Sequence, residues 1–252
     1  MVTCFQRNVD ISAFNDGKIV SDFRPALIDG ECYVRVKRSK YCTRIPNLNE
    51  DIAYLSGIIA GDGSFKMTSR TGSYPRVAIV ITNKSVQFLK DIDRLVEENF
   101  HYPGRIYERN GGGHFDYRIN NKIIFLYFRR VVGIDKKRAK LHIPKKLLTG
   151  KFLRFFLAGL FDTDGYFSED TFGIMLNARN YSLLLEIKTN LCVRGIYFGN
   201  ICRNTLIVDG RPYYRIIMRL RKKSVAKFRK FVPLKHEKYM GPQGIGPRVF
   251  PA

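Results

Sequence analysis

The chain has 252 residues, of which 44 are Lys or Arg and 22 are Asp or Glu, so its formal net charge is +22. Hydrophobic residues make up 45% of the sequence and aromatic residues 13%, which is enough for folded cores and excludes a disordered basic tail. A positive charge of this size is self-repulsive and indicates a polyanionic partner such as nucleic acid.

Residues 1–48 form a basic N-terminal extension. Two interpretations fit it: the extension contacts nucleic acid beyond the main binding surface, or it is a basic strand and loop that caps the first domain. Its first ten residues are polar and mixed, so we expect no secretory signal. The most apolar run, residues 123–128, is too short to span a bilayer. We therefore expect an intracellular protein of the cytoplasm, nucleoid or organelle matrix, without a membrane partner.

Two stretches of the chain share one pattern: residues 55–63 read LSGIIAGDG and residues 157–165 read LAGLFDTDG. Each predicts an apolar helix whose small residues, four positions apart, lie on one stripe of its surface. Because such stripes let two helix backbones approach closely, we expect the two helices to pack against each other. The small residues are Gly57 and Gly61 in the first copy, and Gly159 and Thr163 in the second.

Each predicted helix runs into an acid, Asp62 or Asp164, and then into a glycine that allows a sharp turn into a strand. Packed helices would present both carboxylates at one end, where they could bind divalent cations. A single Asp before a glycine at a helix end is more often a solvated turn residue. Duplication of the whole arrangement favours metal binding.

The same layout follows each acid, and this predicts an internal repeat. Two strands, a helix, two more strands and a final helix are expected in each half. In the first half these are residues 64–70 and 76–82, a helix opened by Asn83 and Ser85 that reaches about residue 100, and residues 104–109, 114–120 and 122–132. In the second half they are residues 166–168 and 172–178, a helix opened by Asn180 and Ser182 that reaches about residue 193, and residues 198–203, 212–220 and 222–231.

These motifs resemble those of the single-chain, two-motif LAGLIDADG homing endonucleases. The resemblance implies an α+β fold of two pseudo-symmetric αββαββα repeats, each with an antiparallel saddle-shaped sheet, packed through the two motif helices. It also implies a monomeric, site-specific endonuclease of the kind that mobile introns encode, which hydrolyses one phosphodiester on each strand of duplex DNA with divalent metal ions.

In that family the eighth motif position binds the metal, which here is Asp62 in the first copy and Asp164 in the second. The sixth position, Ala60 or Asp162, is not a ligand in the family. Mg²⁺ is the expected cofactor, with Mn²⁺ or Ca²⁺ able to substitute for binding, because hard oxygen ligands suit it and the five cysteines and four histidines form no soft metal cluster. Backbone oxygens of the preceding residues would complete the protein's ligands; these residues are Gly61 and Thr163.

The resemblance further implies a catalytic lysine after the last helix of each repeat, and the matching positions are Lys140 and Lys238. Each could instead be a surface charge that neutralises phosphate. Neighbouring residues compete for the same assignment: Lys136, Lys137, Arg138 and Lys235.

Alternating side chains in the predicted strands indicate sheets with one basic, hydrogen-bonding face and one apolar face. In residues 64–70, for example, Lys66 and Arg70 share a face while Phe65 and Met67 share the other. A two-stranded ribbon fits the DNA major groove, although alternation alone also occurs in solvent-facing sheets. The candidate DNA-binding residues are Lys66, Arg70, Arg76, Arg105, Tyr107, Arg109, Arg118, Arg179, Arg203, Tyr213, Arg215 and Arg219.

The predicted organisation places the first repeat at residues 49–135, an interdomain connection at 136–150, the second repeat at 151–240 and a C-terminal arm at 241–252. The connection has no flexible Gly/Ser stretch, so we expect the repeats to be held rigidly. Two other functions fit the same scaffold: an intron RNA maturase or splicing cofactor, and a DNA-binding regulator that does not cleave.

Overall fold

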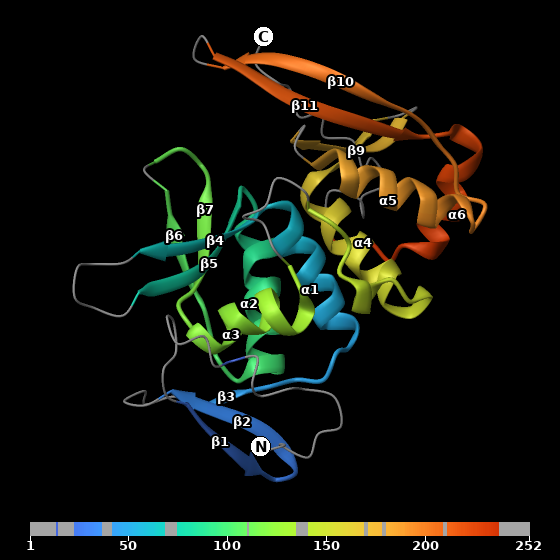
Figure 1. The fold of residues 1–252 in the computed structure, drawn as a ribbon. Coiled ribbons are helices and arrows are strands. Elements are labelled where there is room, and N and C mark those ends of the chain that lie inside the picture. The colour runs from blue at the N-terminus through green and yellow to red at the C-terminus, as the bar shows by residue number, and fades with distance from the viewer. Residues whose placement is uncertain are drawn as a thin grey trace.

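The computed structural model describes residues 14, 23–36, 42–68, 75–109, 111–134, 141–168, 171–177, 180–208 and 211–236. Two halves, each built of helices on a four-stranded antiparallel sheet, lie side by side with helices α1 and α4 between them (Figure 1). The predicted fold class is confirmed, because both sheets are antiparallel and the halves pack through the helices that carry the two motifs.

The first half begins with α1, whose N-cap Asn49 accepts a hydrogen bond from the Ile52 amide at 2.8 Å. Its sheet has the strand order β4-β5-β7-β6, and α2 lies between the two strand pairs in the sequence. The final helix α3 continues as a π-helix over Tyr127–Val132, which ends at Gly133 with a φ of 97°. The elements are α1 (Glu50–Gly61), β4 (Gly63–Thr68), β5 (Arg76–Asn83), α2 (Val86–Phe100), β6 (Arg105–Glu108), β7 (Phe115–Ile119) and α3 (Lys122–Leu126).

The second half repeats this order with the strand sequence β10-β11-β9-β8. Its last two strands form a long hairpin, because β10 continues well past residue 203, where we expected it to end (Figure 1). Short 3-10 helices over Lys145–Leu147 and Lys222–Ser224 precede α4 and α6. The elements are α4 (Gly150–Asp164), β8 (Gly165–Ser168), β9 (Thr171–Asn177), α5 (Tyr181–Cys192), β10 (Phe198–Val208), β11 (Arg211–Leu220) and α6 (Val225–Phe231).

The apolar face of each sheet packs against the helices of its own half. In the first half Phe65 of β4 meets Phe125 of α3 edge-on, with ring centroids 5.2 Å apart. In the second half Phe161 of α4 stacks on Phe172 of β9 at 5.6 Å and contacts Phe228 of α6 at 4.7 Å. The opposite face of each sheet is therefore left for polar side chains. Among the described residues, no helix is long and apolar enough to cross a membrane.

Part of the N-terminal extension forms a separate three-stranded antiparallel sheet, of order β1-β2-β3. Asn121, the N-cap of α3, donates to Thr43 Oγ1 at 2.8 Å, and Arg44 donates to the Glu98 carbonyl of α2 at 3.0 Å. The sheet lies beside the start of α1, whereas Asp62 follows the other end of that helix (Figure 1). This position supports the interpretation of a cap on the first half. The strands are β1 (Phe23–Ile28), β2 (Glu31–Val36) and β3 (Cys42–Arg44).

Candidate metal centre and nucleic-acid interface

The crossing of α1 and α4 brings two backbones into direct contact. A Cβ atom added to Gly57 would lie 2.0 Å from the carbonyl oxygen of Phe156, and one added to Gly159 would lie 2.1 Å from the carbonyl oxygen of Tyr54. Both distances are far below van der Waals contact, so only glycine fits at either position. The small-residue stripes are therefore what sets the spacing of the two helices.

The same close approach brings the two acids together. A Cβ atom on Gly61 would lie 2.8 Å from Asp164 Oδ2 and 2.0 Å from Thr163 Oγ1. The carboxylate of Asp164 thus reaches across to the last residue of α1, and Asp62 is the next residue in the chain. Asp62 and Asp164 are both half-buried, at the same end of the helix pair.

The donors at this end suit a hard divalent cation. Two helices end here, and the carbonyl end of a helix carries partial negative charge. No group of three or more His, Cys, Asp or Glu side chains within the described ranges could hold a metal ion. Mg²⁺ is commonly bound by one or two carboxylates, with waters and substrate phosphates as its other ligands, so the residues present fit it. The Thr163 hydroxyl donates to Leu160 O at 2.9 Å within its own helix, so the main-chain oxygen is the candidate ligand at this residue.

Asn83 is a residue of this site that the sequence patterns did not assign to it. We expected it to open α2, but it is the last residue of β5, and the N-cap of α2 is Ser85, which accepts from the Phe88 amide at 3.1 Å. The Asn83 amide nitrogen donates to Asp62 Oδ2 at 3.3 Å, while its oxygen accepts from the Ser85 amide at 2.9 Å. Asn83 therefore orients a predicted metal ligand. In the second half Asn180 is the N-cap of α5 without a side-chain capping bond.

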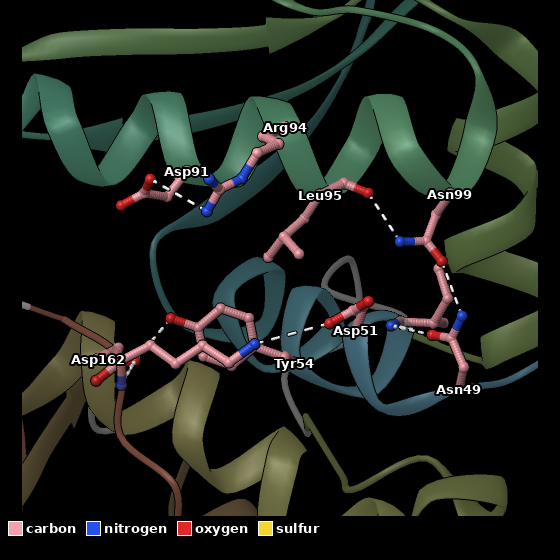
Figure 2. A network of polar contacts seen from close by, with 10 residues as sticks. Asn49, Asp51, Tyr54, Asp91, Arg94, Leu95, Asn99 and Asp162 are labelled. Carbon is pink, nitrogen blue, oxygen red and sulfur yellow. Dashed lines mark hydrogen bonds and ion pairs between the residues drawn. The ribbon is translucent and has the colours of Figure 1, made fainter.

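The sixth motif position has a structural role in the second copy. Asp162 is fully buried and accepts from the Tyr54 hydroxyl at 2.6 Å and from the Lys235 amide at 2.9 Å (Figure 2). Burial and the Asp162 charge raise the pKa of Tyr54 far above its usual range, so the tyrosine stays protonated and donates. This bond joins α1 to α4. At the related place in the other copy the residues are apolar, Ala60 and Phe156.

Residues 233–236, which we call the strap, leave the second half and dock on the first. The Lys235 ammonium lies 3.7 Å from Asp51 Oδ1 and 4.6 Å from the centre of the Tyr54 ring. The His236 ring packs on Phe88 of α2 with centroids 4.4 Å apart. Since Asp51 lies in the first turn of α1, Lys235 is directed away from Asp62 and does not fit the role of the catalytic lysine.

The register of the first sheet gathers most of its candidate DNA-binding residues on one face, because residues directly opposite in antiparallel strands share a face. Lys66 pairs with Ala78, and Val80 pairs with Arg118, which also pairs with Arg105. This is the face turned away from the core. It also includes Arg76, opposite Thr68, and Tyr107, opposite Asp116, while Arg109 follows β6 and is exposed.

The second sheet has a similar polar face with one exception. Tyr213, Arg215 and Arg219 alternate along β11, and Arg219 Nε donates to the Tyr166 hydroxyl at 3.0 Å. Arg203 is directly opposite Ile216, whose side chain is in the core, so it lies on the other face. An irregularity in β10 between Phe198 and Ile201 shifts the alternation, and this corrects our placement of Arg203 among the DNA-facing residues.

Four predicted site residues lie outside the described residues: Lys140, Lys238, Arg70 and Arg179. The alternative candidates for the role of the catalytic lysine that lie outside the described residues are Lys136, Lys137 and Arg138.

Comparison with known proteins agrees with this geometry. The sequence model of the LAGLIDADG-like domain matches residues 49–133. The matched residues comprise α1, the first sheet, α2 and α3, and the resemblance to LAGLIDADG homing endonucleases expected from the sequence is confirmed.

Three solved structures of the homing endonuclease I-DmoI have a fold similar to that of this chain. The complex with DNA and Mn is 20% identical, covers 75% of this chain and 99% of its own, and has a TM-score of 0.56. A single-residue variant of I-DmoI, with its target DNA in the presence of Mg, is 20% identical, covers 74% and 97%, and has a TM-score of 0.55. The complex with DNA and Ca is 21% identical, covers 72% and 86%, and has a TM-score of 0.52. At these identities the likeness shows the fold.

Proposed function

We propose that this protein is a site-specific, metal-dependent endonuclease that cuts both strands of duplex DNA, as a monomer encoded by a mobile intron. The observation that carries the proposal is the reach of Asp164 Oδ2 over Gly61, which brings two motif acids to one end of the helix pair. Structures of similar fold have been solved with DNA and Mn, and with target DNA in the presence of Mg.

In this proposal Asp62, Asp164 and the main-chain oxygens of Gly61 and Thr163 hold the cations. A bound divalent cation supplies an activated water and stabilises the leaving oxygen during phosphodiester hydrolysis. The packed helices fix the two carboxylates relative to each other. The basic sheet faces bind phosphates and so position the duplex over the acids. Each half contributes one acid, which matches one cut per strand.

Lys140 and Lys238 remain proposed as the lysines that order water or phosphate near each acid. The two sheet faces carry different residues, so the target should be only partly palindromic. A single chain supplies both halves of the site, which is why we propose that it acts without a second copy.

Cleavage of a randomised duplex library tests this function. In Mg²⁺ we expect a small set of sequences to be cut on both strands, and in EDTA we expect no cutting, because the carboxylates alone cannot activate water. In Ca²⁺ we expect the selected sequences to be bound. Undiminished cutting in EDTA, or nicks confined to one strand, would contradict the proposal. Splicing of an intron RNA by a protein that cuts no DNA would support the maturase instead.

Replacement of Asn83 tests the positioning of Asp62. For Asn83→Ala we expect cleavage to slow by about 10- to 100-fold at limiting Mg²⁺, the usual effect of losing a residue that orients a metal ligand. The measurement is the cleavage rate as a function of Mg²⁺ concentration.

The matched control is Ser85→Ala, which removes the cap of α2 but leaves the contact with Asp62. It should lower the free energy of unfolding by about 1 kcal/mol and leave cleavage unchanged. Equal Mg²⁺ profiles for the two variants would show that Asn83 serves only the turn before α2.

A further inference from the structure

One carboxylate lies among the basic residues on the outer face of the first sheet. Asp116 of β7 is 7% exposed and sits between Thr82 of β5 and Tyr107 of β6, its direct partners in the register. A negative charge on a surface that meets a polyanion weakens binding. A carboxylate at this place is compatible with DNA binding if it orients a neighbouring basic side chain.

Both carboxylate oxygens of Asp116 accept hydrogen bonds, and one of these bonds comes from Arg118. Oδ1 accepts from the Thr82 hydroxyl at 2.8 Å, and Oδ2 accepts from an Arg118 guanidinium nitrogen at 3.0 Å. Burial alone would raise the pKa of Asp116, but the hydrogen bonds from Thr82 and Arg118 hold it below its usual value. The carboxylate is therefore ionised at neutral pH and fixes the arginine from one side.

Tyr107 supports Arg118 from another side. The guanidinium carbon lies 5.4 Å from the centre of the Tyr107 ring, within the range of cation–π attraction. The Arg118 side chain is still 47% exposed. A guanidinium has five N–H donors in a planar fork, and the bond to Asp116 uses only one of them. The guanidinium of Arg118 is thus exposed, and its orientation is fixed before DNA binds.

The surroundings of Arg118 favour a base edge over a phosphate. A hollow on this face is lined by Lys66 of β4, by Arg76 and the small Ala78 of β5, and by Arg118 and Asn120 at the end of β7. The fixed carboxylate beside Arg118 repels phosphate, whereas the O6 and N7 atoms of guanine are neutral acceptors that a planar fork contacts together.

We propose that Arg118 recognises a guanine in the major groove of the half-site that lies under the first sheet, with Asp116 and Tyr107 as positioning residues. The proposal rests on the proposed function, since it requires that this face binds duplex DNA. It specifies that Arg118 recognises guanine and that the carboxylate of Asp116 makes this recognition selective.

Binding selection from a randomised duplex library in Ca²⁺ tests the proposal with the parent protein, Arg118→Lys and Asp116→Asn. We expect the parent to prefer guanine at one position of one half-site. Both variants should lower that preference by roughly tenfold, because a bidentate pair with guanine is worth this or more in discrimination. Preferences at the other positions should not change. The control is Arg94→Lys, which alters an exposed arginine of α2 that pairs with Asp91 and should leave the guanine preference intact.

Equal weakening of all sequences by Arg118→Lys would identify a phosphate contact and overturn the proposal. Thermal unfolding shows whether Asp116→Asn still folds. If it does not fold, Thr82→Val replaces it, because this variant removes only the hydroxyl donor to Asp116. Thr82→Val should then lower the guanine preference at the same position. A guanine preference unchanged by Thr82→Val would show that Asp116 is not a positioning residue. A parent that selects no sequence refutes the proposed function itself. A parent that selects a sequence in which Arg118→Lys affects no guanine refutes only the inference.

Discussion

Replacing either motif acid by its amide is expected to abolish double-strand cleavage for practical purposes. For Asp62→Asn and for Asp164→Asn we expect the rate to fall by about 10³-fold or more, since the metal-assisted step is worth several kcal/mol and each 1.4 kcal/mol is about tenfold. The amide has the shape of the carboxylate but not its charge, so the fold should persist. The measurement is the cleavage rate on a selected target in Mg²⁺, with DNA binding measured separately in Ca²⁺.

The same substitution two residues earlier provides a control. Asp162 lies in the same motif, but it is fully buried and bonded to Tyr54 and Lys235. Asp162→Asn should therefore affect mainly the free energy of unfolding, and its folded fraction should cut like the parent. If Asp62→Asn and Asp164→Asn also cut like the parent, neither acid takes part in the reaction.

Adding one methyl group to the helix crossing is expected to have the largest effect on stability. In Gly159→Ala the new Cβ would meet the Tyr54 carbonyl oxygen at 2.1 Å and the Ile58 nitrogen at 2.8 Å, so main-chain atoms rather than a flexible side chain would have to move. We expect the free energy of unfolding to fall by about 3 kcal/mol or more, the upper end of the usual cost of overpacking. Denaturant unfolding followed by circular dichroism measures this change.

The first residue of the same helix offers the matched control. In Gly150→Ala the Cβ would meet nothing closer than Arg194 at 3.7 Å, which is ordinary contact. This variant should be as stable as the parent or more stable by up to about 1 kcal/mol, because alanine favours a helix over glycine. If Gly159→Ala were equally harmless, the two helices would not be packed as tightly as the structure has them.

The sequence predicted those parts of the molecule that depend on local pattern. The small-residue stripes predicted the helix pair, because small side chains four residues apart on an apolar helix favour close packing against a second helix. Alternation of side chains also gave the polar sheet faces of β4, β6, β7 and β11. Arg203 was misplaced because an irregularity in β10 between Phe198 and Ile201 moves it to the other face of the sheet. Gly199 lies within this irregularity, and a glycine inside a strand is a signal for a bulge that alternation alone does not use.

Contacts between distant segments could not be predicted in this way. The bond from Asn83 to Asp62 depends on how β5 passes the end of α1, and the residue's spacing before Ser85 is equally typical of a helix start. The three-stranded sheet of residues 23–36 and 42–44 is joined to the first half by a hydrogen bond from Arg44 to α2 and by one from Asn121, the N-cap of α3, to Thr43. Neither arrangement produces a periodic residue pattern from which it could be predicted.

The strap of residues 233–236 bears on how such proteins can be recombined. It is encoded at the end of the second half, yet its contacts include Asp51, Tyr54 and Phe88 of the first. A chimera joined at the connection between the halves would separate these partners even though every secondary-structure element stayed whole. Engineers who exchange halves to obtain new target specificities would therefore need to transfer the receiving surface of α1 and α2 together with the incoming C-terminal segment.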